Sequence, residues 1–155
     1  MKNIALTITF SIFIALFSCK KEEKEIEHDY LETTIKKFNV KNNIKWVIVL
    51  PGLGCQGCIQ EGEAFMKENI SNKDALFILT KIESFKILQN KLDIKLNDHP
   101  NVIIDKRNDF QFPTDNGVYP CIIMLNNGEI KGHTFQSPKN GTAFENLKKQ
   151  IEMKL

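Results

Sequence analysis

The chain has 155 residues, of which 42% are hydrophobic and 26% are charged, and its formal net charge is +2. This length and composition are typical of one globular domain with one packed core. So small a net charge provides no strong field to attract nucleic acid, and Arg107 is the only arginine, so the bidentate side chain favoured for phosphate and base recognition is almost absent. Nucleic-acid binding is therefore not expected.

Residues 1–18 have the layout of an export signal. Lys2 precedes an apolar run over residues 4–17, which is too short to span a bilayer and ends at the small residue Ser18. Residues 16–19, Leu-Phe-Ser-Cys, resemble the lipobox of bacterial lipoproteins, in which the cysteine is acylated and becomes the first residue of the mature protein. The resemblance implies a lipid on Cys19 that anchors the protein to a membrane of the cell envelope, facing the periplasm or the cell surface. Ordinary cleaved secretion and an uncleaved anchor are the alternatives.

The expected domain boundaries follow from this export signal. We expect residues 1–18 to be a signal peptide and residues 19–29 to be the lipidated cysteine with a charged, solvated tether, because six charged residues follow Cys19 directly. Residues 30–155 are then expected to form the folded domain.

Strands and helices alternate through most of that domain. Hydrophobic periodicity and turn residues predict helices over residues 30–38, 59–70, 82–92 and 142–153, and strands over 46–50, 75–79, 101–105, 121–125 and 129–134. Gly62 is a possible kink in the second helix, and Ala64 belongs to its apolar pattern. The turn Asn126-Asn127-Gly128 predicts a tight hairpin between the last two strands. The pattern indicates an α/β fold, with a central mixed sheet, helices on both faces and a C-terminal β-hairpin followed by a helix.

The most informative motif is the pair Cys55 and Cys58 at the start of a predicted helix. This spacing lets the two sulfurs join without movement of the backbone. The partial positive charge of a helix N-terminus favours the thiolate of the leading cysteine. We therefore expect Cys55 to be the nucleophile of thiol–disulfide exchange and Cys58 to resolve the mixed disulfide.

Two other readings of the pair remain, a half-site for zinc and a purely structural bridge. Zinc needs about four ligands, and only Cys121 and the scattered histidines 28, 99 and 133 are left to supply them. A bridge that closes so small a loop removes little chain entropy. We expect neither a metal nor a cofactor.

Two separated motifs lie on either side of the middle of the chain. The first is the buried strand that leads through Pro-Gly-Leu-Gly, residues 51–54, into the cysteine pair, and the second is Gly-Val-Tyr-Pro-Cys-Ile-Ile-Met-Leu-Asn-Asn-Gly-Glu-Ile, residues 117–130. Together they resemble the thioredoxin superfamily, and more closely its small thioredoxin-like lipoproteins of the bacterial cell envelope. The resemblance covers residues 30–154 and implies a thioredoxin-like fold. It also implies that Pro120 follows a cis peptide bond and faces the dithiol, and that Tyr119 and Pro120 bind an extended substrate. An ordinary trans proline is the alternative.

The sequence departs from the family pattern at two positions. Gly54 stands where many members have tryptophan, which predicts a less aromatic surface beside the cysteines. Val49 stands where thioredoxins carry a buried acid, so proton transfer to Cys58 needs water or another group. We expect Cys121 to be a buried, inert thiol, with a third redox cysteine as the alternative. His99 and His133 are expected to be structural or surface residues without an acidic or cysteine neighbour.

The hypothesis that follows is a membrane-anchored thiol–disulfide oxidoreductase. Its partners would be cysteine-containing envelope proteins and an upstream thiol or disulfide protein, with the direction of exchange left open. A peroxidase is disfavoured because the peroxiredoxin pattern Pro-x-x-x-Thr-x-x-Cys is absent around residues 51–55. The alternative from another class is a non-catalytic binding lipoprotein of the same fold, which holds a partner protein, a haem-maturation intermediate or Cu(I).

Overall fold

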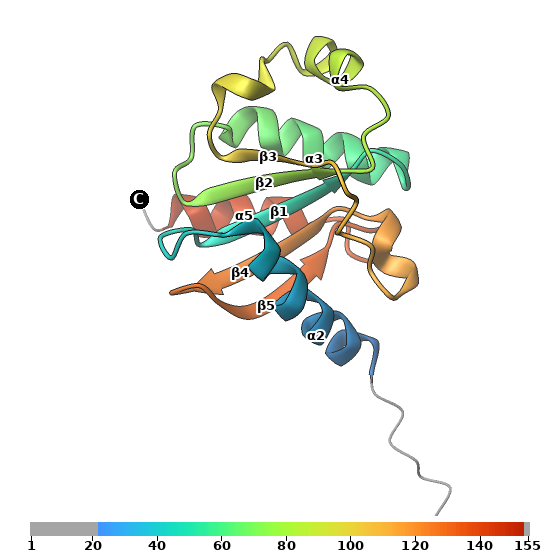
Figure 1. The fold of residues 1–155 in the computed structure, drawn as a ribbon, viewed down its shortest axis with the longest axis vertical. Helices are drawn as coiled ribbons and strands as arrows, with labels where there is room; N and C mark the ends of the chain where they lie inside the picture. The colour runs from blue at the N-terminus through green and yellow to red at the C-terminus, as the bar shows by residue number, and fades with distance from the viewer. Residues whose placement is uncertain (1–21, 154–155) are drawn as a thin grey trace, which may run out of the picture.

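A computed structural model describes residues 22–153, and its elements alternate as expected for an α/β fold (Figure 1). The chain order is α2 (Glu23–Ile35), η1 (Lys36–Phe38), β1 (Trp46–Pro51), α3 (Gln56–Asn69), β2 (Ala75–Thr80), α4 (Phe85–Leu92), η2 (Leu96–Asp98), β3 (Val102–Asp105), η3 (Asp115–Val118), β4 (Cys121–Asn126), β5 (Glu129–Phe135) and α5 (Ala143–Glu152), where η marks a 3-10 helix.

The strands form one mixed sheet in the order β3-β2-β1-β4-β5. The pairs β1–β2 and β2–β3 are parallel and are connected through α3 and α4, whereas β1–β4 and β4–β5 are antiparallel. Asn127 and Gly128 both have positive φ, 51° and 82°, as a tight hairpin turn between β4 and β5 requires. The expected mixed sheet and C-terminal hairpin are therefore confirmed.

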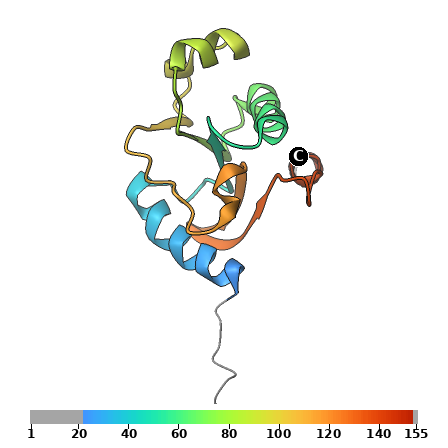
Figure 2. The same ribbon diagram turned by 90° about the vertical axis from the view of Figure 1, so that its right-hand side faces the viewer.

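Strand β1 is buried over its whole length because helices pack on both faces of the sheet. Its side chains alternate between two hydrophobic clusters. Trp46, Ile48 and Leu50 belong to the cluster under α3, α4 and α5, while Val47 and Val49 belong to the cluster on the face that carries α2. Figures 1 and 2 show this arrangement of α2 on one side of the sheet and α3 and α5 on the other.

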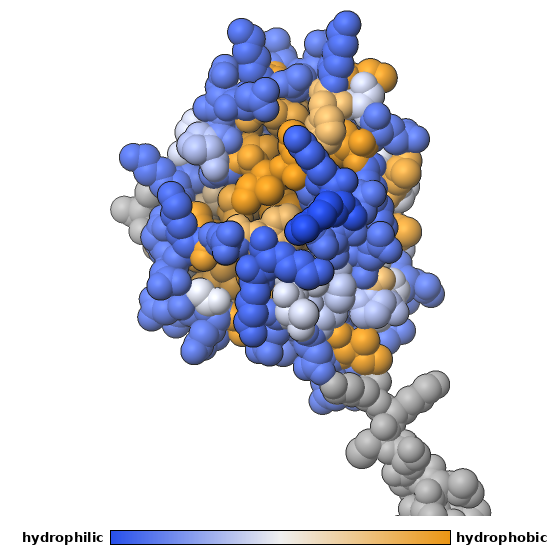
Figure 3. Space-filling view, viewed as in Figure 1, coloured by the Kyte–Doolittle hydropathy of each residue, from blue (hydrophilic) through white to orange (hydrophobic). Residues whose placement is uncertain are grey.

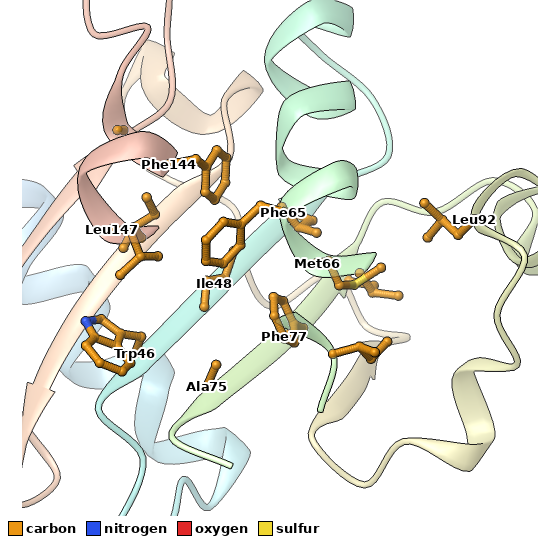
Figure 4. Close-up of a cluster of buried hydrophobic side chains, with 14 of the residues drawn as sticks. Trp46, Ile48, Phe65, Met66, Ala75, Phe77, Leu92, Phe144 and Leu147 are labelled. Atoms are coloured by element: carbon orange, nitrogen blue, oxygen red, sulfur yellow. The ribbon is translucent and has the colours of Figure 1, made fainter. Parts of the chain in front are cut away.

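The first cluster is the larger one and contains the aromatic contacts that fix α3 and α5 on the sheet. Phe65 of α3 stacks on Phe144 of α5, with ring centroids 5.0 Å apart, and Phe65 also contacts Phe77 of β2. Figure 4 shows the rings of Phe65 and Phe144 near Ile48 of β1, with Phe77 on the neighbouring strand β2. The position of α3, and so of the cysteine pair at its start, is set by this packing.

Helix α2 begins earlier than the sequence predicts. Its first residue is Glu23, and Glu27, which we expected in a solvated tether, is only 3% exposed. The proposed boundary at residue 30 is therefore wrong, because the helix extends the buried stripe of Leu31 and Ile35 one turn towards the N-terminus. Both hydrophobic clusters consist of residues between 30 and 151. A protein that begins at Lys20 therefore keeps both clusters and all of the described residues.

Gly62 is the point of closest approach between α3 and β1, and α3 runs through it without interruption. A Cβ atom on Gly62 would lie 2.6 Å from Cδ2 of Leu50 and 3.2 Å from Cζ of Phe144. The predicted kink at Gly62 is therefore absent from α3. Glycine is needed at this position because a side chain would clash with Leu50 and Phe144. Ala64, assigned to the apolar stripe, is instead exposed.

Substitution of Gly62 tests this packing. Gly62→Ala should lower the free energy of unfolding by about 1–3 kcal/mol, because the buried neighbours have little room to move. Gly57→Ala in the same helix is the matched control, since a Cβ there meets no atom within 4 Å. It should leave stability unchanged or raise it by up to about 1 kcal/mol. Urea unfolding followed by circular dichroism measures both, and equal stability of the two variants would contradict the packing argument.

Candidate functional site

The cysteine pair lies where β1 ends and α3 begins. Cys55 is the N-cap of α3 with extended backbone, and Cys58 lies in the first turn of the helix. The two residues form a disulfide, and their Cα atoms are 5.3 Å apart. Cys55 is partly exposed, whereas Cys58 is only 7% exposed. The prediction that the spacing permits a bridge is confirmed, and Cys55 is the more accessible partner.

The segment before β4 lies directly against this turn. The backbone N–H of Cys55 donates a hydrogen bond of 3.0 Å to the carbonyl of Val118. Tyr119 is partly exposed and Pro120 is buried, so the two predicted substrate-binding residues follow immediately after the contact with Cys55. The tertiary structure thus brings together the two motifs that the sequence separates.

The Tyr119–Pro120 peptide bond is trans, because residues 22–153 contain no cis peptide bond. The expectation of a cis bond is therefore wrong for this structure. With Tyr119 extended, the chain enters β4 so that the carbonyl of Pro120 accepts a 2.9 Å hydrogen bond from the backbone of Gln136, just beyond β5. The N–H of Tyr119 donates to the carbonyl of Asn116 at 3.0 Å, so this N–H is already paired within the chain.

Glycine is required at position 54 for a structural reason that the sequence did not indicate. Its φ is +146°, and a Cβ atom there would lie 2.1 Å from the carbonyl oxygen of Val118. No other residue fits such an approach between two backbones. Gly54 is therefore the residue that allows the cysteine turn to hydrogen-bond to the segment before β4.

Exposed apolar side chains surround the disulfide. Leu53 is 50% exposed and Val118 is 43% exposed, on the two segments that meet at Gly54. Ile87, 69% exposed, lines a cavity of about 160 Å³ that also contacts Gln56, the residue after Cys55. Three of the four large hydrophobic side chains exposed in residues 22–153 therefore lie near the cysteine pair. These three exposed apolar side chains are all aliphatic.

Val49 and Cys121 are paired neighbours in the sheet on the face that carries α2. Both are buried, and Cys121 is fully so. Burial, followed by the negative charge of Glu27, raises the pKa of the Cys121 thiol well above its ordinary value. The prediction of a buried thiol is confirmed, and its high pKa makes it a poor nucleophile.

Glu27 forms a buried polar cluster that the sequence did not reveal. Its Oε1 accepts hydrogen bonds from Oγ1 of Thr114 at 2.5 Å and Nδ2 of Asn116 at 2.7 Å, and its Oε2 lies 2.9 Å from Nε2 of His133. The expectation that His133 has no acidic neighbour is therefore wrong. The sequence contained one indication that Glu27 is buried: it lies four residues before Leu31 and therefore on the same face of α2.

The surroundings of Glu27 set its charge. Burial by itself raises the pKa of Glu27, but the hydrogen bonds from Thr114, His133 and Asn116 and the attraction of His133 outweigh it, so the pKa lies below its ordinary value of 4.5. An ionised carboxylate only accepts, so Nε2 of His133 carries the proton in their contact. The cluster ties α2 to the η3 segment that leads to Val118 and Tyr119.

The other histidines lie apart from the cysteine pair. His28 is 3.5 Å from Glu32 on α2, and His99 lies in the loop before β3. Within residues 22–153 no group of three or more His, Cys, Asp or Glu side chains is arranged to hold a metal ion. The predicted signal peptide and the predicted lipidation site at Cys19 lie outside the described residues. None of the helices in the described part of the chain has the length and apolar character needed to cross a membrane.

Comparison of the chain with protein-family models, with curated proteins and with solved structures found no match.

Gly54→Ala tests the contact between the cysteine turn and Val118. The substitution should lower the free energy of unfolding by more than about 2 kcal/mol, because it combines an unfavourable φ with a backbone clash. It should also speed hydrogen exchange of the Cys55 amide, whose acceptor is displaced. NMR-detected exchange measures this, with Gly57→Ala as the control. Unchanged Cys55 exchange in a folded Gly54→Ala protein would refute the proposed role of Gly54.

Glu27→Gln tests the buried cluster. At pH 7 the variant should be less stable by about 1–3 kcal/mol, because charge-assisted hydrogen bonds are lost in a buried setting. Since the folded-state pKa of Glu27 is lowered, its contribution is complete above pH 4.5 and is lost as the pH falls through the folded-state pKa. The stability gap to the wild type should therefore narrow as the pH falls below 4.5 and through the folded-state pKa, as denaturant unfolding at each pH would show. Glu32→Gln, on the exposed side of α2, is the control, and a gap that does not depend on pH would contradict the assignment.

Proposed function

We propose that the protein is a thioredoxin-like thiol–disulfide oxidoreductase that works through Cys55 and Cys58. The observation that carries the proposal is the placement of the cysteine pair at the N-terminus of α3, with Cys55 partly exposed, Cys58 buried and the Val118–Pro120 segment hydrogen-bonded beside them. A purely structural bridge would gain little from closing so small a loop. It would also gain nothing from an accessible sulfur.

The helix N-terminus supports the chemistry of Cys55. The first backbone N–H groups of α3 have no partner within the helix, and together with the helix dipole they stabilise negative charge at its start. A thiolate on Cys55 lies at this position, whereas Cys58 lies inside the first turn and is covered. The geometry therefore favours Cys55 as the sulfur that bonds to a partner and Cys58 as the one that is displaced and returns.

The exchange proceeds in two balanced steps. A thiolate of the substrate attacks Sγ of Cys55, the Cys55–Cys58 bond breaks, and Cys58 leaves as a thiolate that takes a proton. The second thiolate of the substrate then attacks the substrate sulfur of the mixed disulfide and releases Cys55. Two electrons pass from the substrate dithiol, which becomes a disulfide, to the protein, which becomes a dithiol. The reverse sequence reduces a partner disulfide, and the relative reduction potentials set the direction.

The surroundings of the pair indicate how partners are held. Leu53 and Val118 form an exposed apolar rim beside the disulfide, and the partly exposed Tyr119 continues it towards β4, where Pro120 is buried. Such a rim binds exposed apolar segments of unfolded or flexible polypeptides by burial of surface area. We infer that the substrates are cysteine-containing envelope proteins, presented as extended segments, and that an upstream thiol or disulfide protein restores the redox state.

The proposed location is the cell envelope, with the domain held at a membrane by a lipid on Cys19. The start of α2 at Glu23 leaves only residues 20–22 between that cysteine and the folded domain. Three extended residues span roughly 10 Å, so the domain would lie close to the membrane surface. An oxidising compartment also suits an accessible disulfide.

The decisive test uses the protein from Lys20 to Leu155, which contains every described element of the fold. Dithiothreitol slowly reduces a model protein disulfide by itself, and the wild-type protein should accelerate this reduction. Cys55→Ser should abolish the acceleration, because the attacking sulfur is gone. Cys58→Ser should accumulate mixed disulfides with envelope proteins, because the resolving sulfur is gone. Cys121→Ser is the matched control and should retain the wild-type rate, since its thiol is buried.

Two results would contradict the proposal. One is an unchanged rate in Cys55→Ser. The other is failure of Cys58→Ser to capture any protein from an envelope extract, which would favour a binding role for the domain. Mass spectrometry of the captured proteins would identify the substrates, and the reduction potential of the pair would give the direction of exchange.

A further inference from the structure

A second cavity lies at the end of the sheet opposite the cysteine pair. It has a volume of about 480 Å³ and is bounded by residues 38–44, by the turn at 70–73 and by residues 99–103, where β1, β2 and β3 begin. Strand β1 has six residues, so roughly 20 Å separates its amino end from the cysteine turn. The cavity is therefore independent of the proposed redox site.

The cavity exists because α2 covers only part of its face of the sheet. In Figures 1 and 2 the helix lies over the β4–β5 side, and no helix of residues 22–153 covers β2 and β3 on this face. Figure 3 shows hydrophobic side chains gathered over these strands with hydrophilic residues around them. Six apolar side chains line the cavity: Phe38, Val40, Ile44, Ile70, Leu76 and Ile103.

Hydrogen bonds within the chain hold the polar wall of the cavity in place. Nδ2 of Asn101 lies within hydrogen-bond distance of three carbonyl oxygens, those of Ile70 at 3.0 Å, Asn72 at 3.2 Å and Ala75 at 3.2 Å. Oδ1 of Asn72 accepts from the backbone N–H of Asp74 at 2.9 Å. This wall does not depend on a ligand, so the cavity is preformed, as small-molecule sites usually are.

The charges around the cavity have one sign. Lys41 and Lys73 line it, and none of the lining residues is Asp or Glu. The acid next to Lys73 in the chain, Asp74, is paired with Lys45 at 2.5 Å, outside the lining. Within residues 22–153, neither Lys41 nor Lys73 forms an ion pair. The cavity thus combines an apolar floor with two cations at its edge.

We propose that this cavity binds a medium-chain fatty carboxylate, with the hydrocarbon tail on the apolar floor and the carboxylate beside Lys41 and Lys73. The volume lies within the roughly 300–1,000 Å³ range of small-molecule sites. A protein partner would instead need a surface of about 800 Å² on each side, much of it flat. Burial of the tail supplies affinity, and the two ammonium groups select an anionic head over a cationic one.

The test is a titration of the Lys20–Leu155 protein with decanoate below its micelle concentration, by calorimetry and by NMR of backbone amides. Decanoate should bind one to one and shift amides in residues 38–44, 70–73 and 99–103, but not those in 53–58. Decyltrimethylammonium, which has the same tail and the opposite charge, should bind at least about tenfold more weakly. Absence of decanoate binding, or shifts confined to the cysteine site, would overturn the proposal.

Variants separate the contribution of the head group from that of the tail. Lys41→Gln with Lys73→Gln should weaken decanoate binding by about tenfold and leave disulfide exchange unchanged. The matched control, Lys86→Gln with Lys139→Gln, removes two exposed lysines outside the cavity and should bind as the wild type does. Ile103→Glu should abolish binding in a protein whose circular dichroism is unchanged.

Two further outcomes would overturn the proposal. Equal weakening by the control pair would show that only the net charge matters. A dimer that light scattering detects in the wild type, that Ile103→Glu disrupts and that decanoate does not affect would show that a second copy of the chain occupies this face. Because Lys41 and Lys73 are exposed, their substitution tests the proposal even if the Ile103 variant fails to fold.

Discussion

The contact between Gly54 and Val118 is the constraint on which the candidate site depends. Here the backbone of the cysteine turn comes so close to the carbonyl of Val118 that no side chain fits, and the N–H of Cys55 donates to that same carbonyl. One hydrogen bond thereby fixes the start of α3 against the segment that leads into β4. The accessible sulfur, the apolar rim and the residues Tyr119 and Pro120 take their relative positions from it.

The strands and helices that pack around this contact hold its two segments in place. Strand β1 is buried on both faces, so it cannot shift without exposing both hydrophobic clusters. Helix α3 is pressed against β1 at Gly62 and stacked on α5 through Phe65 and Phe144. On the opposite face, the buried carboxylate of Glu27 joins α2 to the η3 segment before Tyr119. The accessible cysteine is therefore held on a rigid frame, as preorganised chemistry requires.

The two ends of the sheet carry different kinds of surface. At the carboxyl end of β1 the exposed apolar side chains of Leu53 and Val118 lie beside a disulfide, where we propose that polypeptide partners bind. At the amino end lies an apolar cavity with two lysines that form no ion pair within residues 22–153, where we propose that one small anion binds. Both surfaces contain apolar residues that no helix of residues 22–153 covers. Such residues remain available to a ligand.

The sequence alone determined the order of the elements, the buried strand, the hairpin and the cysteine pair, because these depend on periodicity, turn residues and spacing over a few positions. Only the tertiary structure decided features that join distant segments. The partnership of Glu27 with His133, the need for glycine at position 54 and the paired N–H of Tyr119 all arise from contacts between residues far apart in the chain. Local patterns carry no record of such contacts, since each depends on how the sheet brings its helices and loops together.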